Sequence, residues 1–349
     1  QVEHNIQMVI HLGDITHENT TPEWEVADGA HALLDAAGVP YTMATGNHDY
    51  APLSSFSRDQ TQLNDWFGPD RFAGAPWYGG SYGGKNDSSY AFFEAGGYEF
   101  MVISLEHAPR KDVLCWAEGR LAAHPARRAI LVTHCYLTHG GVYSLSCADG
   151  YDTPGSSGLT VWKELASRHS NVFMVLCGHV GDSEHVVKTG NAGNTVHELL
   201  VDYQFEAACT GGACSNHCQA GFYTGNGWLR RLTFDPGANT VHAETWSVEA
   251  GNPAVFPGGE PALFCSDVST QGKDHYDADA AGPDHTFSFA YDLTSPVAPY
   301  QYAPPASGAF MDRTVNSAGG GEQLDPAVAM NAAGDIAVAW ESAVERGYL

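Results

Sequence analysis

The sequence is poor in basic residues and has no long apolar run. It contains 16 Lys and Arg against 41 Asp and Glu, which gives a formal net charge of -25. A surface this negative repels nucleic acid and anionic lipid, so neither is expected as a general partner. No apolar stretch approaches the roughly 20 residues of a membrane-spanning helix, so no membrane span is expected. The acidity is typical of a protein that stays soluble in a salty or extracellular setting.

The composition is that of a folded protein. The chain has 349 residues, of which 43% are hydrophobic and 11% aromatic, which excludes wholesale disorder. A chain of this length buries a sizeable core and has room for one large domain with additional segments, or for two domains.

Of the eight cysteines, two lie in predicted helix or strand and the other six in loop-like, Gly-rich or Ser-rich surroundings. Cys115 in a helical pattern and Cys177 at the end of an apolar run are expected to be buried thiols. Three others, Cys209, Cys214 and Cys218, crowd into one short loop. They could form a disulfide cluster or, with His217 between them, a zinc knuckle. We favour disulfides because the spacing matches no strong zinc pattern, and disulfides predict an extracellular, periplasmic or cell-surface location.

Polar residues follow four apolar runs at the points where the predicted strands end. Because parallel strands bring their carboxyl ends to one edge of a sheet, we expect these polar side chains to converge there. A helix with the apolar spacing of residues 24–37 separates the first two runs, which predicts a βαβ unit and an α/β fold. The runs cover residues 8–12, 41–44, 129–133 and 172–177, followed by Gly13-Asp14, Gly46-Asn47-His48-Asp49, His134 and Gly178-His179.

The convergent residues predict a metal centre. Asp14 and Asn47 offer oxygen ligands, and His134 and His179 offer imidazole nitrogens. Mixed oxygen and imidazole ligands suit Mn, Fe or Zn, whereas all-oxygen sites suit Mg and Ca. One such residue alone would more often be a hydrogen-bonded structural group, but four at successive strand ends favour a site.

The second half of the chain changes character. Residues 195–203, 228–234, 240–247 and 286–293 are β-type runs without long helices between them, and we expect them to form a second sheet packed on the first. Residues 294–321 are rich in Pro, Ala, Gly and Ser and are predicted to be a linker. Residues 322–349 contain two alternating apolar strands and resemble the start of a β-repeat of large bacterial surface proteins. The sequence is therefore expected to be truncated at both ends.

The motifs together resemble those of the calcineurin-like metallophosphoesterases, of the secreted bacterial type. Gly13-Asp14 matches the GD motif, Gly46-Asn47-His48-Asp49 the GNHD motif, Thr133-His134 the single-His motif, and Gly178-His179 the first half of the GHxH motif. The resemblance covers residues 1–293. It implies a two-sheet αββα sandwich that holds two divalent metal ions.

The resemblance also implies a role for each site residue. Asp14 would bridge the two metals, and Asn47, His134 and His179 would complete the shell of the second. A metal-bound hydroxide would attack a phosphate mono- or diester. The catalytic residue His48, held by Asp49, would contact the phosphate or protonate the leaving oxygen.

Two departures from the family pattern concern the first metal. The family's opening DxH-type motif would precede Asp14, where only residues 1–12 remain, and Gly181 stands in place of the last His of GHxH. Asp182 or His185 could substitute for it. His17 stands where purple acid phosphatases carry a ligating Tyr, although a surface-loop histidine is the preferred interpretation. The alternative function is therefore a non-catalytic, degenerate metallophosphoesterase module of a large bacterial surface protein.

Overall fold

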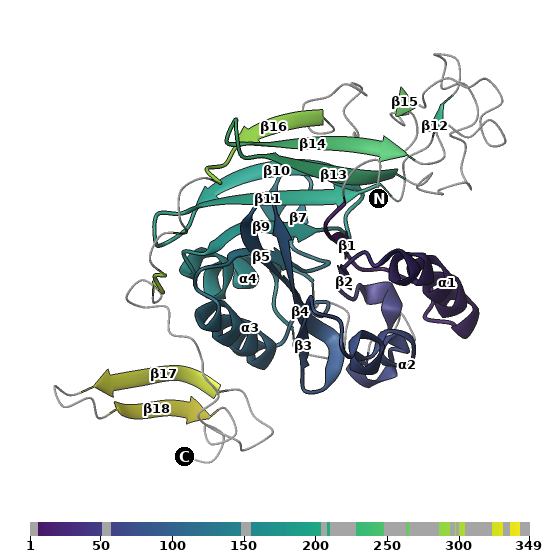
Figure 1. Cartoon of the computed structure of the whole chain (residues 1–349). Helices are drawn as coiled ribbons and strands as arrows, with labels where there is room; N and C mark the ends of the chain where they lie inside the picture. The colour runs from purple at the N-terminus through teal and green to yellow at the C-terminus, as the bar shows by residue number, and fades with distance from the viewer. Residues whose placement is uncertain are drawn as a thin grey trace. The chain divides into compact units, whose positions relative to one another are not determined.

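A mixed seven-stranded sheet is the framework of the fold in the computed structural model (Figure 1). The structure describes residues 6–50, 57–147, 155–203, 208–209, 228–247, 263–264, 286–293, 297, 300–303, 323–330 and 336–342. Strands β5, β6, β9 and β11 are parallel, and β3, β4 and β10 pair antiparallel at the two edges. In spatial order the strands are β10 Asp182–Thr189, β11 Thr195–Asp202, β9 Val172–Cys177, β6 Arg128–Val132, β5 Tyr98–Ser104, β4 Lys85–Ala95 and β3 Tyr78–Tyr82.

The predicted βαβ unit is present at the start of the chain. Strands β1 (Val9–His11) and β2 (Tyr41–Met43) pair in parallel, and α1 (Thr21–Ala37) connects them. Thr20 caps the helix, and Glu23 Oε2 accepts hydrogen bonds from its backbone N–H and its hydroxyl at 2.9 and 2.7 Å. Gly38 ends the helix in the left-handed conformation at φ 64°, which glycine adopts without strain. Because the two strands are parallel, the loops that follow them, with Asp14 and Asn47, lie at the same edge of this two-stranded sheet.

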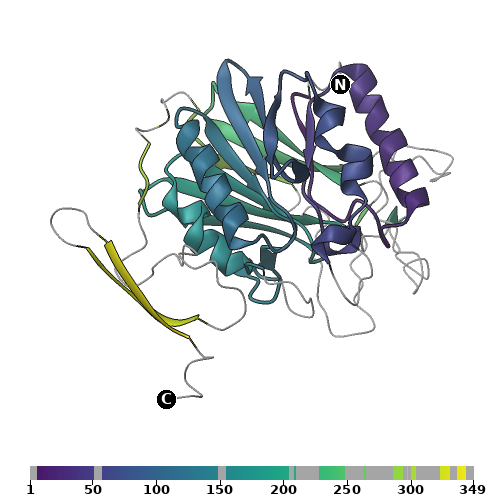
Figure 2. The same ribbon diagram turned by 90° about the horizontal axis from the view of Figure 1, so that it is seen from below.

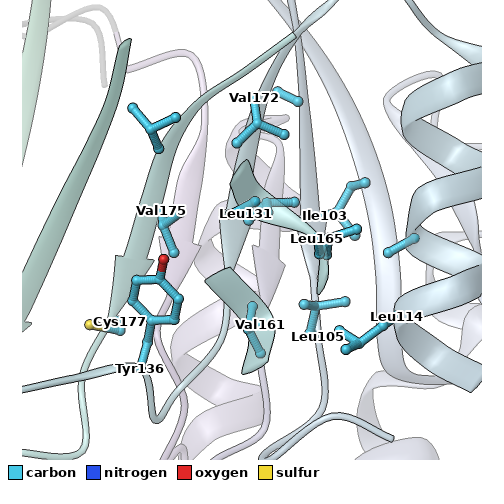
Figure 3. Packing of buried hydrophobic residues seen from close by; sticks show 14 of the residues in the cluster. Ile103, Leu105, Leu114, Leu131, Tyr136, Val161, Leu165, Val172, Val175 and Cys177 are labelled. Carbon is cyan, nitrogen blue, oxygen red and sulfur yellow. The ribbon is translucent and has the colours of Figure 1, made fainter. Parts of the chain in front are cut away.

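Alternate residues of the main strands supply two separate cores. One face carries Ile103, Leu131 and Val175, which pack with Leu114 of α3 (Lys111–Ala123) and Val161 of α4 (Gly158–Glu164) (Figure 3). Figure 2 shows α3 and α4 side by side over this face. The opposite face has its own buried cluster, which includes Phe100, Val102, Ile130, Met174 and Leu199.

A three-stranded antiparallel sheet contributes to that second cluster. It consists of β13 Trp228–Asp235, β14 Thr240–Ser247 and β16 Thr286–Ala290, and its residues Val241 and Phe289 are buried in the cluster. One expectation for this region was wrong. Residues 195–203 were predicted to join the second sheet, but β11 lies in the main sheet, parallel to β9. Its run of five buried residues is typical of an interior parallel strand.

The remaining described elements are short. They are α2 Leu63–Phe67 with three 3₁₀ turns between residues 47 and 72, a fourth at Ala166–Arg168, and the two-residue pairs β7 Leu137–Thr138 with β8 Val142–Tyr143 and β12 Ala208–Cys209 with β15 Leu263–Phe264. The chain divides into two compact units, residues 1–304 and 305–349. In the second unit, β17 (Gln323–Met330) and β18 (Ile336–Ser342) form an antiparallel hairpin. Within the described residues, no helix is long and apolar enough to cross a membrane.

The cysteines differ in part from expectation. Cys177 is buried as predicted, but Cys115 is exposed on the outer side of α3, because the neighbouring Leu114 and Ala117 take the inner side. Cys135 and Cys147 form a disulfide that closes a loop of 12 residues directly after His134. The predicted cluster of Cys209, Cys214 and Cys218 lies outside the described side chains.

Candidate metal centre

Asp14 and His134 meet at the centre of the candidate site. Asp14 follows β1 and His134 follows β6, and Asp14 Oδ2 lies 3.0 Å from His134 Nε2. His134 Nδ1 lies 2.8 Å from the Leu12 carbonyl oxygen, which only accepts, so Nδ1 carries a hydrogen and Nε2 is the ring nitrogen directed at Asp14. In metal-binding histidines the ring nitrogen that does not bind the metal usually donates such a hydrogen bond, which fixes the orientation of the ring.

Asn47 and His179 form the second pair of the site. His179 Nδ1 lies 2.9 Å from Asn47 Oδ1, and the rings of His134 and His179 have centroids 5.1 Å apart. His48, the residue after Asn47, links the two pairs through its backbone, because its N–H donates a hydrogen bond to Asp14 Oδ1 at 3.0 Å. The structure therefore brings together all four residues that the sequence analysis selected as metal ligands.

Backbone strain coincides with this cluster. Asp14 and His179 adopt positive φ values of 50° and 71°, which non-glycine residues rarely do. Such strain is maintained only where the surrounding structure fixes it, and it gathers at functional sites. The flanking glycines are needed for space: a Cβ on Gly13 would lie 2.6 Å from His134 Nδ1, and one on Gly46 would lie 2.0 Å from Asp14 Oδ1.

The protonation states suit a cation. Burial acts to raise the pKa of Asp14, but the His134 ring and the His48 N–H outweigh it and hold that pKa below its usual range. Burial lowers the pKa of His179 to about 4, with a further contribution from His134. The carboxylate is thus ionised and the His179 imidazole neutral near pH 7, as metal ligands must be. His134 differs: burial acts to lower its pKa, but Asp14 outweighs burial and raises that pKa, so a cation has to displace a proton from this ring.

Asp49 has a different role from the one expected. It is fully buried and accepts hydrogen bonds from Thr16 N, Thr16 Oγ1 and Gly46 N at 2.8, 3.0 and 2.8 Å. His48 is held instead by the His17 carbonyl, whose oxygen lies 2.7 Å from His48 Nδ1. Asp49 therefore joins the loop after β1 to the loop after β2. We expected Asp49 to orient the His48 ring, but the His17 carbonyl oxygen does so.

Two further residues of the site were not selected from the sequence. His107 follows β5 and is fully buried, and its ring centroid lies 5.7 Å from that of His134 and 5.5 Å from that of His179. Asp202 ends β11 and lines the same cavity as Asp14 and His134. Both obey the rule that selected the candidate ligands, because each is a polar residue at or just past the end of a strand.

The residues considered as substitutes for the missing GHxH histidine make other contacts. Asp182 Oδ2 lies 2.8 Å from His139 Nδ1. His185 Nε2 lies 3.1 Å from His197 Nδ1, and its ring stacks on Phe287 at a centroid distance of 4.7 Å. His185 is thus part of an aromatic cluster between β10, β11 and β16.

The donor set has the chemistry that suits a borderline-soft divalent cation. Asp14, Asn47, His134 and His179 provide a carboxylate, an amide oxygen and two imidazoles with one ring already oriented. Counting only His, Cys, Asp and Glu, the described part of the chain contains no group of three or more side chains placed to hold a metal ion.

Comparison with known sequences decides the family. The sequence profile of the calcineurin-like phosphoesterases matches residues 1–211, a span that includes all four ligand motifs. The chain belongs to the calcineurin-like phosphoesterase family. The resemblance seen in the motifs is thereby confirmed, and the α/β fold with a mixed main sheet is consistent with this family.

One curated protein and one solved structure are similar to this calcineurin-like phosphoesterase over most of its length. The "Uncharacterized protein YvnB" of Bacillus subtilis (strain 168) is 29% identical over 300 residues, which are 84% of this chain but 19% of that protein. The purple acid phosphatase PPD1 of yellow lupin (Lupinus luteus) is 17% identical, with a TM-score of 0.41 over 83% of this chain and 48% of that one. The chain thus spans about a fifth of the length of YvnB and about half of the length of the lupin phosphatase chain.

Proposed function

We propose that the protein is a metal-dependent hydrolase of small phosphate mono- or diesters. The observation that carries the proposal is the convergence of Asp14 with His134 at 3.0 Å and of Asn47 with His179 at 2.9 Å, within a calcineurin-like phosphoesterase domain. Family membership alone does not establish an activity, because one fold serves many functions.

The residues of the site have separate tasks in this proposal. Asp14, Asn47, His134 and His179 would hold the divalent ions, of which Mn, Fe and Zn suit the ligands, with Asp14 as the bridge if two are bound. Bound metal supplies a Lewis acid and lowers the pKa of water toward neutrality. His48 has its Nδ1 hydrogen committed to the His17 carbonyl, so Nε2 is the nitrogen that can exchange a proton with the leaving oxygen.

The remaining parts of the proposal concern architecture and location. We propose that residues 1–293 form a two-sheet αββα domain, that 294–321 are a linker and that 322–349 begin a β-repeat domain. The disulfide between Cys135 and Cys147 supports an extracellular, periplasmic or cell-surface location, because disulfides persist in oxidising compartments.

The test is metal-dependent turnover. The full chain is titrated with Mn²⁺, Zn²⁺ and Fe²⁺ while hydrolysis of a chromogenic phosphate monoester and diester is followed. We expect metal-dependent turnover that Asp14→Asn lowers at least about 100-fold, the upper part of the range for loss of a site-orienting group. Asp59→Asn is the matched control, because its side chain is 91% exposed. Equal activity of wild type and Asp14→Asn would contradict the proposal.

A second candidate function is a non-catalytic module of a surface protein. Gly181 favours it, because glycine has no side chain to ligate a metal where the family carries a histidine. In that case one metal would bind tightly and raise the unfolding temperature without turnover of either ester.

A further inference from the structure

Two histidine rings lie stacked in the loops that carry the candidate metal ligands. His17 follows β1 and His48 follows β2, and their ring centroids are 5.0 Å apart with an angle of 20° between the planes. Both line the cavity of about 1340 Å³ that also contains Asp14 and His134. A pair of imidazoles thus stands beside the proposed metal ligands, and the proposed function uses only one of them.

The His48 ring is fixed in both orientation and tautomer. Its Nδ1 hydrogen bonds to the His17 carbonyl oxygen at 2.7 Å, while its backbone N–H donates to Asp14 Oδ1 at 3.0 Å. Because a carbonyl oxygen only accepts, His48 Nδ1 carries the hydrogen in the neutral ring. The other nitrogen of His48 is left to a ligand in the cavity.

The loop that carries His17 is held in place by α1. Glu23 in the first turn accepts hydrogen bonds from the backbone N–H groups of His17, Glu18 and Thr20, at 3.3, 3.1 and 2.9 Å. The backbone of His17 is therefore ordered, while its side chain is exposed to solvent. No buried polar contact has to be broken for the His17 ring to meet a ligand.

We propose that His17 and His48 form a paired-imidazole subsite for the phosphate oxygens of the substrate. The inference rests on the proposed function and deepens it: Asp14, Asn47, His134 and His179 would hold the metal, and the two rings would contact terminal oxygens on the open side. N–H donors to an anionic oxygen form charge-assisted hydrogen bonds, which are stronger than neutral ones. His17 is then a specificity-determining residue rather than an ordinary surface histidine.

Three substitutions of His17 separate this role from mere stacking. His17→Phe keeps a flat ring without a donor, His17→Gln keeps a donor without the ring, and His17→Ala removes both. The matched control is His242→Phe, an exposed histidine on β14. All four retain the His17 carbonyl that orients His48, and all replace exposed side chains, so we expect unchanged thermal unfolding.

The measurement is the affinity of zinc-loaded full chain for inorganic phosphate, by calorimetry. We expect His17→Phe and His17→Ala to weaken binding about tenfold, the loss of roughly one charge-assisted hydrogen bond, and His17→Gln to stay within about threefold of wild type. In ¹⁵N imidazole spectra of the wild type, phosphate should shift the His17 and His48 ring signals and leave that of His242 unchanged.

The outcomes distinguish this inference from the proposed function. Phosphate binding by His17→Phe as tight as wild type would overturn the paired subsite, since stacking alone would then suffice. Failure of the zinc-loaded wild type to bind phosphate would overturn it too. If wild type binds phosphate through His17 but hydrolyses neither ester, the subsite stands and the hydrolase proposal fails.

Discussion

Gly46 and Asp14 approach so closely that a Cβ on residue 46 would lie 2.0 Å from Asp14 Oδ1 and 2.3 Å from the Asp14 backbone nitrogen. The two residues come from loops that follow neighbouring parallel strands. Their contact explains in steric terms why glycine precedes Asn47 in this site.

Gly46→Ala should therefore damage the metal centre. The added methyl group must displace the Asp14 carboxylate or its backbone, and we expect manganese affinity to fall about 10- to 100-fold, as for loss of other groups that orient ligands. Calorimetric titration with Mn²⁺ measures this. Gly119→Ala is the control, because its Cβ would meet nothing within 4 Å on α3, and it should stabilise the fold by about 0.5 to 1 kcal/mol. Equal metal affinity in both variants would refute the steric explanation.

Asp49→Asn tests whether Asp49 acts as a structural link between loops. One amide oxygen cannot replace two carboxylate oxygens, so the Gly46 N–H or the Thr16 donors lose their acceptor in a buried place. We expect the free energy of unfolding to fall by about 1 to 3 kcal/mol, measured by urea denaturation. Asp59→Asn, at an exposed position, should leave it unchanged. If Asp49→Asn unfolds like wild type but has lost turnover, the structural explanation is contradicted and Asp49 takes part in the reaction directly.

Glu198 predicts a dependence of stability on pH. It is fully buried on β11 and accepts hydrogen bonds from the Tyr136 and Tyr143 hydroxyls, and burial raises its pKa to about 7. Because the folded pKa exceeds the unfolded value near 4.5, the folded state binds more protons between these values, and stability is lost as pH rises through 7.

Replacing Glu198 should remove that dependence. From pH 5 to pH 8, wild type should lose up to about 3 kcal/mol of unfolding free energy that Glu198→Gln retains. Urea denaturation at both pH values measures the difference. Glu94→Gln, at an exposed position, should follow the wild type. A Glu198→Gln variant with the same pH slope as wild type would show that Glu198 is ionised in the folded protein.

The disulfide should support both the fold and the site. Replacing Cys135 and Cys147 together by serine opens a 12-residue loop, and we expect a loss of about 2 to 3 kcal/mol. The loop also holds His107, whose Nε2 lies 3.0 Å from the Cys147 carbonyl oxygen and whose ring lies against those of His134 and His179. Opening the loop should therefore disturb these two candidate ligands and lower the metal affinity as well. Urea denaturation with and without dithiothreitol checks the first effect. Dithiothreitol should lower the unfolding free energy of the double variant less than that of wild type. An equal loss in both would show that the reductant acts on cysteines other than Cys135 and Cys147.

The sequence predicted the part of the site that depends on strand ends. Apolar runs before Asp14, Asn47, His134 and His179 located them at one sheet edge, since parallel strands leave no other place for such residues. His107 obeys the same rule but was not selected, because no glycine motif marks it. The sheet to which β11 belongs was not predicted, because the apolar residues of one strand do not specify which strands it pairs with. The exposure of Cys115 depended on the rotation of α3, which its weak apolar pattern left undetermined.

The shared carboxylate of Asp49 has a consequence for changing this protein by selection. Because Thr16 in one loop and Gly46 in the other both depend on it, mutations in the two loops will not act independently. Libraries that vary one loop alone would then return few stable variants, whereas libraries that vary residues 14–17 and 46–49 jointly would reach compatible combinations.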